Sequence, residues 1–441
     1  MLSRGRNAVF AVLTPLVVDA NLRNQDYFVK GRNESLINDR GAARFLNVRN
    51  HNISLVLRLF LRHGVLTRAA LTRLTGLSAT TITNLVAELI EEGLLAEMGP
   101  EVDPERSGAG RPAVAVRLLP ERRLALGVHF GIGVVNVGLV DLLGQTGLMV
   151  PVPHTLDESA ETVIARVADA ATSIIASEPG LRERVVGIGV GASGLVDVRN
   201  GVNRLASRLG WRDVPLGPML AGHLGMPVWV DNNARTMALA ETLFGVGRDA
   251  GTLMFIYVGR GLGCGLVFEG RLFHGSTDGA GEVGHMTIVP SGGRQCHCGN
   301  TGCLETLVSR DALGQVAQDL GIQGPDGEAP SADDLVAAAR SGESVAGAAV
   351  VEAAGHLGVG IATLVNAFNP ELVVLGGLAA EAADLMLPTV LETVRSRAFP
   401  FLGSSVRIEL TSLGSSVGLI GAAALALDSF YSDPLGVNRP A

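Results

Sequence analysis

Three cysteines lie within eight positions of one glycine-rich segment, GGRQCHCGNTGCLE (292–305). They are Cys296, Cys298 and Cys303, and the rest of the 441-residue chain contains one further cysteine, Cys264. Four cysteines are too few for the disulfide framework of a secreted protein, and clustered thiols in a reducing compartment more often hold a metal ion. The spacing therefore predicts a metal site, and it favours the cytoplasm as the location of the protein.

The elements that position this segment belong to a folded protein of more than one domain. A chain of 441 residues with 18% charged residues, 47% hydrophobic residues and 57 glycines is expected to form two or three compact, turn-rich domains. Segment 8–18, AVFAVLTPLVV, has the hydropathy of a signal-peptide core. It lacks an A-x-A-like cleavage site and is too short to span a bilayer. We therefore expect residues 1–43 to be a flexible extension or a stretch encoded upstream of the true start, and we expect no membrane segment.

The charge is distributed unevenly along the chain. The net charge is −8, but residues 1–73 carry twelve Arg or Lys and four Asp or Glu, so that this part is +8 and the remainder is −16. A basic head on an acidic body favours contact of the head with a polyanion such as DNA. A basic N-terminus that is merely solvated is the alternative.

Residues 44–119 are typical of a winged helix-turn-helix. Apolar residues recur at helical spacing from Asn50 onward, and LTRAALTRLTGLSATTITNLVAELIEEGLL (66–95) reads as helix, glycine turn and helix, with Thr67 and Ser78 as caps. The segments 93–99 and 107–119 are predicted to form the two strands of a wing. A helical dimerisation module is the alternative interpretation.

The second helix of this motif should present its short polar side chains to DNA. A buried stripe is predicted at Ile82, Leu85, Val86 and Leu89, which leaves Thr80, Thr83, Asn84 and Ala87 on the opposite face. Such side chains allow a helix to lie deep in the major groove. Arg106 and Arg111 of the wing are placed to reach phosphates or the minor groove. The residues predicted to contact DNA are Ser78, Thr80, Thr81, Thr83, Asn84 and Arg111.

From residue 120 onward the pattern changes to that of an α/β protein. Apolar, β-branched runs that end in glycines alternate with alanine-rich helical stretches such as 160–177 and 344–367. This alternation predicts a ligand cleft at the ends of the strands. The two halves of this region resemble each other weakly, which suggests a duplicated lobe.

Several motifs together resemble the ROK family of sugar kinases and sugar-responsive repressors. They are GAGEVGHMTI (279–288), C-x-C-G-x-x-G-C-L-E (296–305), NPELVVLGG (369–377), LGWRDVPL (209–216) and ALAETLFG (238–245). The resemblance covers roughly residues 44–427. It implies a two-lobed, actin-like (ribonuclease-H-like) sugar-kinase fold over 120–430, with a second lobe at about 236–411 and a tail at 431–441, behind the winged helix-turn-helix.

The resemblance also implies a ligand set. His285 is the fourth zinc ligand that the family implies, beside the three cysteines, and His297 is the competing candidate. Three thiolates and one imidazole make a closed, structural zinc site, one per chain. Inert thiols and an iron–sulfur cluster are the alternatives, although a cluster requires a fourth cysteine. By resemblance, Asn232, Glu282, His285 and Glu305 bind sugar hydroxyls; carboxylates that are merely solvated are the alternative for the two glutamates.

The sequence departs from the family's kinases at the catalytic positions. Their Asn-Asp pair, whose Asp takes the proton from the attacking hydroxyl, reads Asn232-Asn233 here, and an amide is not a base at neutral pH. Their first phosphate motif, Asp-x-Gly-Gly-Thr, reads HFGIG (129–133), and their Gly-Thr-Gly loop reads GRG (259–261). Asp231 precedes the pair, but on a strand the adjacent side chain points to the opposite face. We therefore predict no catalytic residues.

These observations predict a DNA-binding repressor of carbohydrate genes whose sensor is derived from a kinase but is inactive. Its expected partners are a double-stranded operator and a sugar effector, and a homodimer or homotetramer is expected. Closure of the lobes around the sugar would move the heads away from the spacing of two half-sites. An ATP-dependent sugar kinase, or a regulator that answers to a partner protein instead of sugar, are the alternatives.

Overall fold

The structure is a computed structural model that describes residues 37–100 and 114–436. The chain divides into two compact units, residues 1–46 and residues 47–441. The first unit contributes the beginning of helix α1 (Ile37–His63), whose side chains are described from residue 47. The wing arginines Arg106 and Arg111 lie outside the described residues. The account below therefore concerns the second unit.

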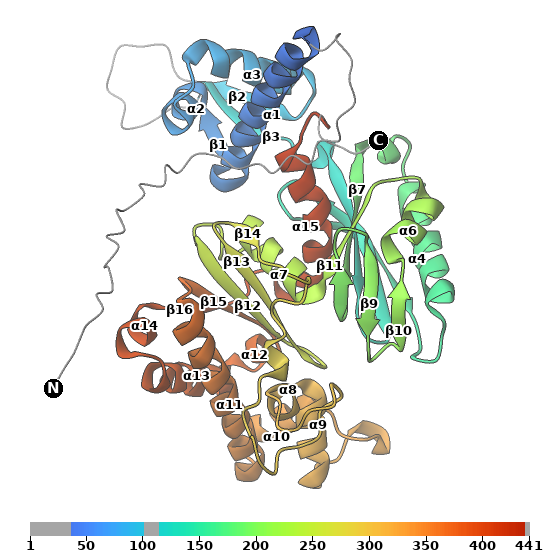
Figure 1. Cartoon of the computed structure of the whole chain (residues 1–441), viewed down its shortest axis with the longest axis vertical. Helices are drawn as coiled ribbons and strands as arrows, with labels where there is room; N and C mark the ends of the chain where they lie inside the picture. Colours follow the sequence, from blue (N-terminus) through green and yellow to red (C-terminus); the bar gives the residue numbers. More distant parts are fainter. Residues whose placement is uncertain (1–36, 101–113, 437–441) are drawn as a thin grey trace, which may run out of the picture. The chain divides into compact units, whose positions relative to one another are not determined.

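A three-stranded sheet and three helices form the predicted winged helix-turn-helix (Figure 1). Helix α2 is capped by Thr67, whose hydroxyl accepts a hydrogen bond from the backbone N of Ala70 at 3.2 Å. Gly76, in the left-handed conformation at φ +70°, ends this helix because no side chain opposes that geometry. The elements, after α1, are β1 (Val65–Thr67), α2 (Arg68–Thr75), α3 (Ala79–Glu91), β2 (Leu95–Pro100) and β3 (Val114–Leu118).

Two details of this domain differ from the expectation. Helix α1 begins at Ile37, before the predicted boundary at residue 44. Strand β1 was not predicted; it pairs antiparallel with β3, which lies between β1 and β2 in the sheet. A three-residue strand has too few alternations to give a periodic signal, and only its pairing partner defines it.

The first lobe contains a five-stranded sheet in the order β11-β7-β4-β5-β6. Strands β4 and β5 pair antiparallel around a glycine turn, and β4 pairs in parallel with β7. A smaller antiparallel sheet, β10-β9-β8, completes the lobe. The strands are β4 (Leu124–Phe130), β5 (Val134–Asp141), β6 (Thr146–Pro153), β7 (Val185–Ala192), β8 (Leu195–Asp197), β9 (Val202–Ala206), β10 (Trp211–Val214) and β11 (Val228–Asn232).

The second lobe repeats this plan in the order β14-β13-β12-β15-β16. Its first strand, β12, again pairs antiparallel with the next strand and in parallel with the fourth. The weak internal resemblance in the sequence is therefore confirmed as a duplicated sheet topology. The strands are β12 (Thr252–Val258), β13 (Leu262–Phe268), β14 (Arg271–Leu272), β15 (Leu372–Gly377) and β16 (Arg407–Leu410).

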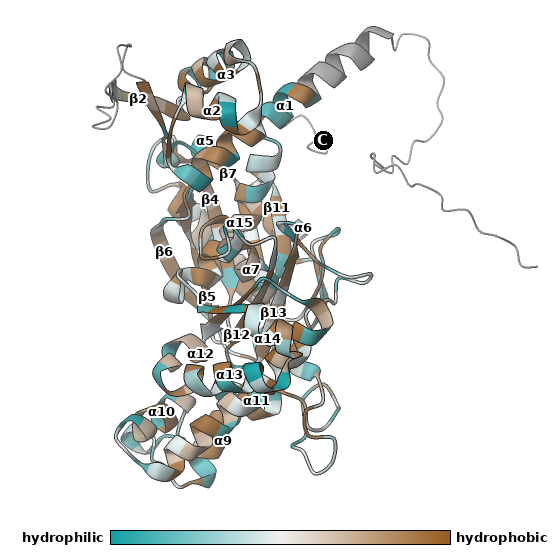
Figure 2. Ribbon diagram, turned by 90° about the vertical axis from the view of Figure 1, so that its left-hand side faces the viewer, coloured by the Kyte–Doolittle hydropathy of each residue, from teal (hydrophilic) through white to brown (hydrophobic). Residues whose placement is uncertain are grey.

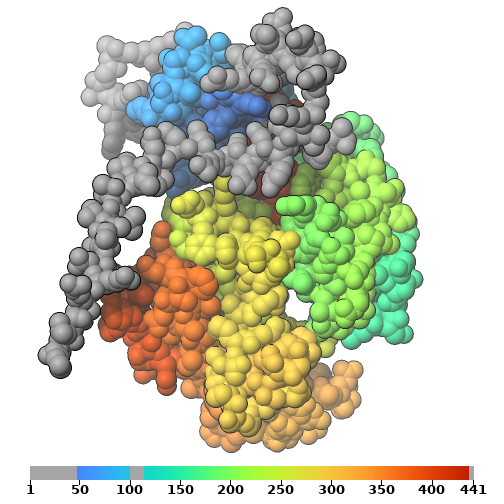
Figure 3. All heavy atoms as spheres, viewed as in Figure 1, coloured from blue at the N-terminus to red at the C-terminus, as the bar shows by residue number. Residues whose placement is uncertain are grey.

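Helices cover the sheets and join the lobes. The predicted helices appear as α4 and α11, and α7 contacts strands β12 and β13 as well as α15, the last helix, which returns to β4 and β7 of the first lobe. In Figure 3 the atoms of the first lobe (teal to green) and of the second lobe (yellow to orange) form separate groups. The helices are α4 (Ala160–Ile175), α5 (Leu181–Arg184), α6 (Leu216–Leu224), α7 (Asn233–Leu243), α8 (Glu305–Val308), α9 (Arg310–Asp319), α10 (Ala332–Arg340), α11 (Ser344–Phe368), α12 (Leu378–Glu381), α13 (Ala383–Arg397), α14 (Pro400–Ser405) and α15 (Val417–Ser432), with 3₁₀ turns at Pro120–Arg122, Val283–His285, Pro325–Gly327 and Gly414–Ser416.

Among the described residues, two helices are long and apolar enough to be considered as membrane spans. They are Ser344–Phe368 and Gly414–Ser432, and 56% and 67% of their apolar windows are buried inside the structure. Figure 2 shows the matching hydrophobic colouring of α11 and α15. Residues such as Leu357, Ile361 and Leu427 are fully buried in the cores of the lobes. Packing inside the protein therefore accounts for their apolar character.

Candidate functional site

The three clustered cysteines and His285 converge on one point. Their ligand atoms all lie within 4.8 Å of one another. The Sγ atoms of Cys298 and Cys303 are 3.7 Å apart, and Sγ of Cys296 lies 3.5 Å from Nδ1 of His285. Tetrahedral zinc with ordinary Zn–S and Zn–N bonds requires ligand separations of about 3.5–3.8 Å. The donor set and its spacing therefore fit a closed, four-coordinate metal site.

His285 presents its two ring nitrogens to different neighbours. While Nδ1 faces the thiols, Nε2 lies 3.8 Å from Oε2 of Glu282. His297, the competing candidate, can join Cys296 and Glu305 in a group of three donors with a single thiol. Its Nδ1 lies closer to Oε1 of Glu305, at 3.0 Å, than to Sγ of Cys296, at 3.9 Å. His297 is thus better placed to link the metal loop to Glu305 than to complete the four-donor set.

Glu305, at the start of α8, is a buried carboxylate whose two oxygens have separate partners. Oε2 accepts a hydrogen bond from the backbone N of Leu262 at 2.8 Å, and Oε1 faces His297 and Arg208 at 3.0 and 3.3 Å. The approach depends on Gly261, because a Cβ there would lie 2.6 Å from Oε2. Strand β13 and the metal loop thus fix this carboxylate from both sides.

Asn232 ends strand β11 and caps helix α7. Its Oδ1 accepts from the backbone N of Ala234, and its Nδ2 donates to the carbonyl of Gly194, both at 2.9 Å. These contacts hold a half-buried amide at the end of the strand. The structure therefore brings together Glu282, His285 and Glu305 around the metal loop, whereas Asn232 lies at the end of a first-lobe strand.

The residues at the positions of the kinase catalytic groups have structural contacts. Nδ2 of Asn233 donates to the carbonyl of Phe130 at 2.9 Å and to Oγ of Ser193 at 3.2 Å. His129 is half-buried, and desolvation of its ring lowers the pKa of the imidazole to about 4, so that the ring is neutral at physiological pH. Its ring lies against α15, where a Cβ on Gly418 would be 2.7 Å away. Neither side chain offers a carboxylate to a metal-bound phosphate.

The two loops at the positions of the kinase phosphate motifs each contain an internal backbone hydrogen bond. The backbone N of Gly131 donates to the carbonyl of Val134 at 3.0 Å, and that of Gly259 donates to the carbonyl of Gly261 at 2.9 Å. Arg260 is half exposed, and its Nε pairs with Asp311 at 3.0 Å. These backbone N–H groups are engaged within the loops instead of pointing to an anion.

Helix α3 carries the residues predicted to contact DNA. Ile82, Leu85, Val86 and Leu89 are buried, as predicted, and Thr80, Thr83 and Asn84 are exposed. Ser78 and Thr81 are partly engaged in capping, because the hydroxyl of Ser78 accepts from the backbone N of Thr81 at 3.1 Å and the two hydroxyls lie 2.8 Å apart. The exposed face of α3 therefore consists of short polar side chains. Arg111 lies outside the described residues.

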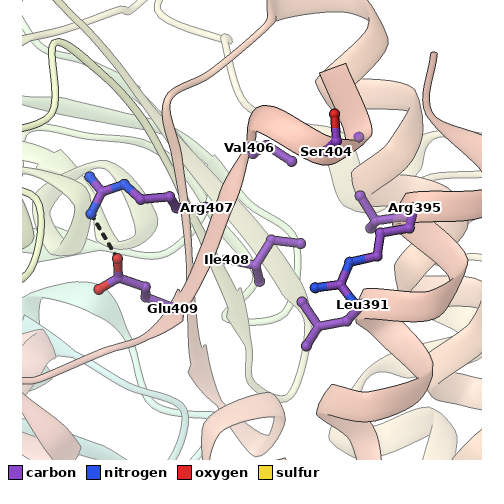
Figure 4. A pocket seen from close by; sticks show the side chains of 9 residues that line it. Leu391, Arg395, Ser404, Val406, Arg407, Ile408 and Glu409 are labelled. Atoms are coloured by element: carbon purple, nitrogen blue, oxygen red, sulfur yellow. Dashed lines mark hydrogen bonds and ion pairs between the residues drawn. The ribbon is translucent and has the colours of Figure 1, made fainter. Parts of the chain in front are cut away.

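A separate pocket of about 360 Å³ lies in the second lobe between β16, α13 and α14 (Figure 4). Apolar side chains such as Leu391 and Ile408 line it, with Arg395 and Arg407 at its sides. None of the residues predicted to bind metal, sugar or DNA lines this pocket. It therefore gives no support to the sugar site.

Two sets of contacts near the site were not predicted from the sequence. Arg208, between β9 and β10, reaches from the first lobe to Glu305 and Asp311 of the second. Asp231 forms buried contacts with Arg235 and His274, all of which lie outside the motifs. A charged residue within an apolar run, as in VWVDN (228–232), was the available signal for Asp231. His274 and the partners of Arg208 come from distant segments, and no local sequence pattern marks them.

Comparison with known proteins distinguishes two groups of relatives. The model of the ROK family matches residues 125–429. The xylose repressor of Caldicellulosiruptor bescii is 30% identical over 391 residues, which cover 87% of this chain and 97% of that protein. The crystal structure of a ROK family transcriptional regulator, a homologue of the Escherichia coli Mlc protein, has a TM-score of 0.74 at 28% identity and covers 88% of this chain and 98% of its own.

A catalytic relative covers less of the chain. The ROK family glucokinase of Streptomyces griseus, solved with glucose and AMPPNP, has a TM-score of 0.62 at 29% identity. It covers 69% of this chain and 99% of its own. The regulators therefore match a larger share of this chain than the kinase does, as expected when the additional share includes the winged helix-turn-helix.

Proposed function

Because this chain belongs to the ROK family, we propose that it is a DNA-binding transcriptional repressor that responds to a sugar. One observation carries this function. A complete helix-turn-helix with an exposed polar face precedes a two-lobed body in the same chain, and repressors match this combination almost from end to end. The sugar and the genes under control are expected to belong to carbohydrate metabolism.

The DNA contacts follow from the geometry of α3. Its buried stripe packs on the rest of the head, so that Thr80, Thr83 and Asn84 face outward. In the major groove an asparagine amide can bind adenine through two hydrogen bonds, while threonines contact several bases or phosphates. Ser78 and Thr81 at the start of the helix are suited to contact a phosphate of the DNA backbone. Arg111, in the predicted wing, is proposed to contact phosphates or the minor groove.

The sugar site is proposed at Asn232, Glu282, His285 and Glu305. Carboxylates that accept hydrogen bonds from hydroxyls, together with an amide, are the groups that bind an uncharged sugar. Binding between the two lobes shifts the population toward the closed state only if the sugar prefers that state. In a dimer or tetramer this shift changes the spacing of the heads, so that two half-sites about one DNA turn apart no longer fit.

The metal proposed for the four-donor site is zinc, one ion per chain. His285, Cys296, Cys298 and Cys303 would hold it, and the ion would fix the loop without taking part in a reaction. The four donors leave no open position for water. The thiol of Cys264 takes no part, because it is buried in β13 and this burial raises its pKa to about 12.

The sensor is proposed to be catalytically inactive. Asn233 replaces the base, a neutral His129 replaces the first acidic group, and the backbone of both former phosphate loops is engaged internally. Phosphoryl transfer depends on positioning the γ-phosphate and its metal, which these loops no longer do. Kinases among the relatives make ATP-dependent phosphorylation the second candidate function.

The remaining proposals concern the protein's surroundings. Three reduced thiols at a metal site favour the cytoplasm. A regulator that answers to a partner protein instead of a sugar is the alternative for the sensor. A homodimer or homotetramer is the proposed assembly, because paired half-sites require paired heads.

The function is tested with the full-length, zinc-loaded protein. Operators are selected from genomic DNA of the source organism, and binding of the selected site is measured by fluorescence anisotropy with and without D-xylose, D-glucose or N-acetylglucosamine. Tight, sequence-specific binding that one sugar weakens is the expected result, and Asn84→Ala is the matched variant with an impaired reading face. Binding of all DNA alike, or sugar-dependent release of ADP, would contradict the proposal.

A further inference from the structure

A buried carboxylate lies next to the proposed sugar ligand Asn232. Asp231, the residue before it on β11, is completely buried, and both of its carboxylate oxygens are engaged. Oδ1 accepts from Nε of Arg235 and from the backbone N of Asn232, each at 2.6 Å, and Oδ2 lies 2.7 Å from Nε2 of His274. Asp231 therefore joins strand β11, helix α7 and the segment that follows β14.

That segment is a closed loop held at both ends. The backbone N of Ala280 donates to the carbonyl of His274 at 3.0 Å, which closes residues 274–280. His274 at the beginning binds Asp231, and Arg235 binds the end, since its Nη1 donates to the carbonyl of Asp278 at 2.8 Å. Two buried charges on β11 and α7 thus determine the position of the loop.

The residues after this loop are those proposed to bind sugar. Gly281 follows at φ +93°, where a Cβ would lie 2.1 Å from the carbonyl oxygen of Cys264, so the backbone runs directly against β13. Glu282 and His285 come next. The position of both therefore depends on where the loop ends, and that end is attached to Arg235.

The burial of these charges is costly, which indicates a specific role. Arg235 is 2% exposed, and its Nη2 has no hydrogen-bond partner among the described residues. A buried ion pair contributes little to stability compared with apolar residues of the same size, whereas it can impose one particular arrangement. The burial of the Asp231–Arg235 ion pair is therefore better explained by a role in fixing the arrangement of the loop than by a contribution to stability.

We propose that Asp231, Arg235 and His274 are positioning residues that hold Glu282 and His285 toward the strand end that bears Asn232. The proposal rests on the proposed function, since it takes those residues to form the effector site. Asp231 thereby has a role different from that of a catalytic base. It faces Arg235 and His274, and it orients the binding loop.

The test compares His274→Phe, His274→Gln and Glu241→Gln in the full-length, zinc-loaded protein. His274 is partly exposed, which allows both substitutions, and glutamine retains a donor toward Asp231. Glu241 is the matched control, because it is a fully buried acid on α7, the helix that carries Arg235. Its carboxylate accepts hydrogen bonds from Thr411 and Val246, away from the loop. Hydrogen exchange of residues 274–285, zinc content and the calorimetric affinity for D-xylose, D-glucose and N-acetylglucosamine are measured for each.

We expect His274→Phe to raise the rate of hydrogen exchange in residues 274–285 about tenfold. It should also lower the affinity for the sugar that wild type binds about tenfold, with zinc retained. His274→Gln should remain within about threefold of wild type, and Glu241→Gln should lower the melting temperature without either effect. If His274→Phe loses zinc or leaves exchange unchanged, or if Glu241→Gln reproduces its effects, the proposal is wrong. Asp231→Asn provides the same measurement should His274→Phe fail to fold. If wild type binds none of the sugars, the proposed effector fails, while the exchange measurement still decides the positioning role.

Discussion

At the scale of single residues, the proposed difference between this protein and a kinase rests on which groups donate hydrogen bonds. The amide of Asn233 donates to the carbonyl of Phe130, a bond that an ionised aspartate cannot make. The residue at the position of the kinase base is therefore part of the packing between β4 and α7. Restoring the base would place a negative charge beside a carbonyl oxygen.

We therefore expect Asn233→Asp to destabilise the protein without producing a kinase. The lost donor and the half-buried charge should lower the free energy of unfolding by about 1–3 kcal/mol at neutral pH. Urea unfolding measures this cost, and a coupled ADP-release assay with several hexoses and N-acetylhexosamines should detect no turnover in either protein. Asn84→Asp makes the same chemical change on an exposed face and should cost no more than about 0.5 kcal/mol. Sugar-dependent turnover near 1 s⁻¹, a rate typical of kinases, in either protein would defeat the interpretation.

The metal site depends on individual thiols. Elemental analysis of purified protein should find about one zinc per chain, and Cys298→Ser should lose the metal together with sugar binding, because the loop that joins Glu282 to Glu305 loses its anchor. Cys264→Ala is the control and should retain the zinc, since that thiol lies in β13. Stoichiometric iron, or unchanged sugar affinity without metal, would be inconsistent with a structural zinc.

At the scale of elements, the residues of helix α3 that stabilise the head and those proposed to read DNA lie on different faces. Its buried stripe holds the helix in place, while its exposed face contains the side chains proposed to read DNA. Because these roles lie on different faces, they can be changed independently. The wing beyond β2 contains Arg111, which is proposed to add contacts that do not depend on sequence.

Asn84→Ala should weaken binding to the selected operator by about 1–3 kcal/mol and leave binding to unrelated DNA nearly unchanged. Arg111→Ala should weaken both. Thr67→Ala, which removes the cap of α2 and lies outside the proposed DNA contacts, is the control for the integrity of the head, with an expected loss of about 1 kcal/mol in the free energy of unfolding. Anisotropy titrations at one fixed salt concentration make the comparison, and equal losses of Asn84→Ala on all DNA would exclude base reading by this residue.

At the scale of the whole molecule, the last helix connects the sensor to the first long helix of the head. Arg58 of α1 donates to Asp428 at 2.9 Å, and Asn50 donates to Asp433 at 2.7 Å. Helix α15 also packs on β4, on β7 and on α7, which in turn contacts the second lobe. A movement between the lobes therefore has a continuous packed route to the head.

Removing these two contacts should uncouple the domains. In the double variant Asn50→Ala, Arg58→Ala, the ratio of operator affinities without and with sugar should fall toward one, while sugar affinity and zinc content remain those of wild type. Arg166→Ala, which removes an exposed ion pair to Glu158 on the first lobe, is the matched control. An unchanged ratio in the double variant would show that coupling does not depend on these two polar contacts.

Local patterns in the sequence predicted the helix-turn-helix, the alternation of strands and helices, and the metal site at the three clustered cysteines. The buried stripe of α3 and the caps at Thr67 and Ser78 depend on residues close together in the chain, and the structure confirms them. The duplicated sheet order was only suggested by the weak resemblance of the two halves. The residues of the sugar site came from resemblance to a family, and no local pattern indicated their mutual arrangement.

The tertiary structure decided what depends on distant segments. Strand β1 exists because β3 pairs with it, and Asn233 became a packing residue because the end of β4 lies opposite its amide. The contacts of Asp231 with Arg235 and His274 are decided in the same way, since a buried charge is tolerated only where the fold brings a partner to it. Periodicity describes neighbours along the chain, whereas these roles depend on neighbours in space.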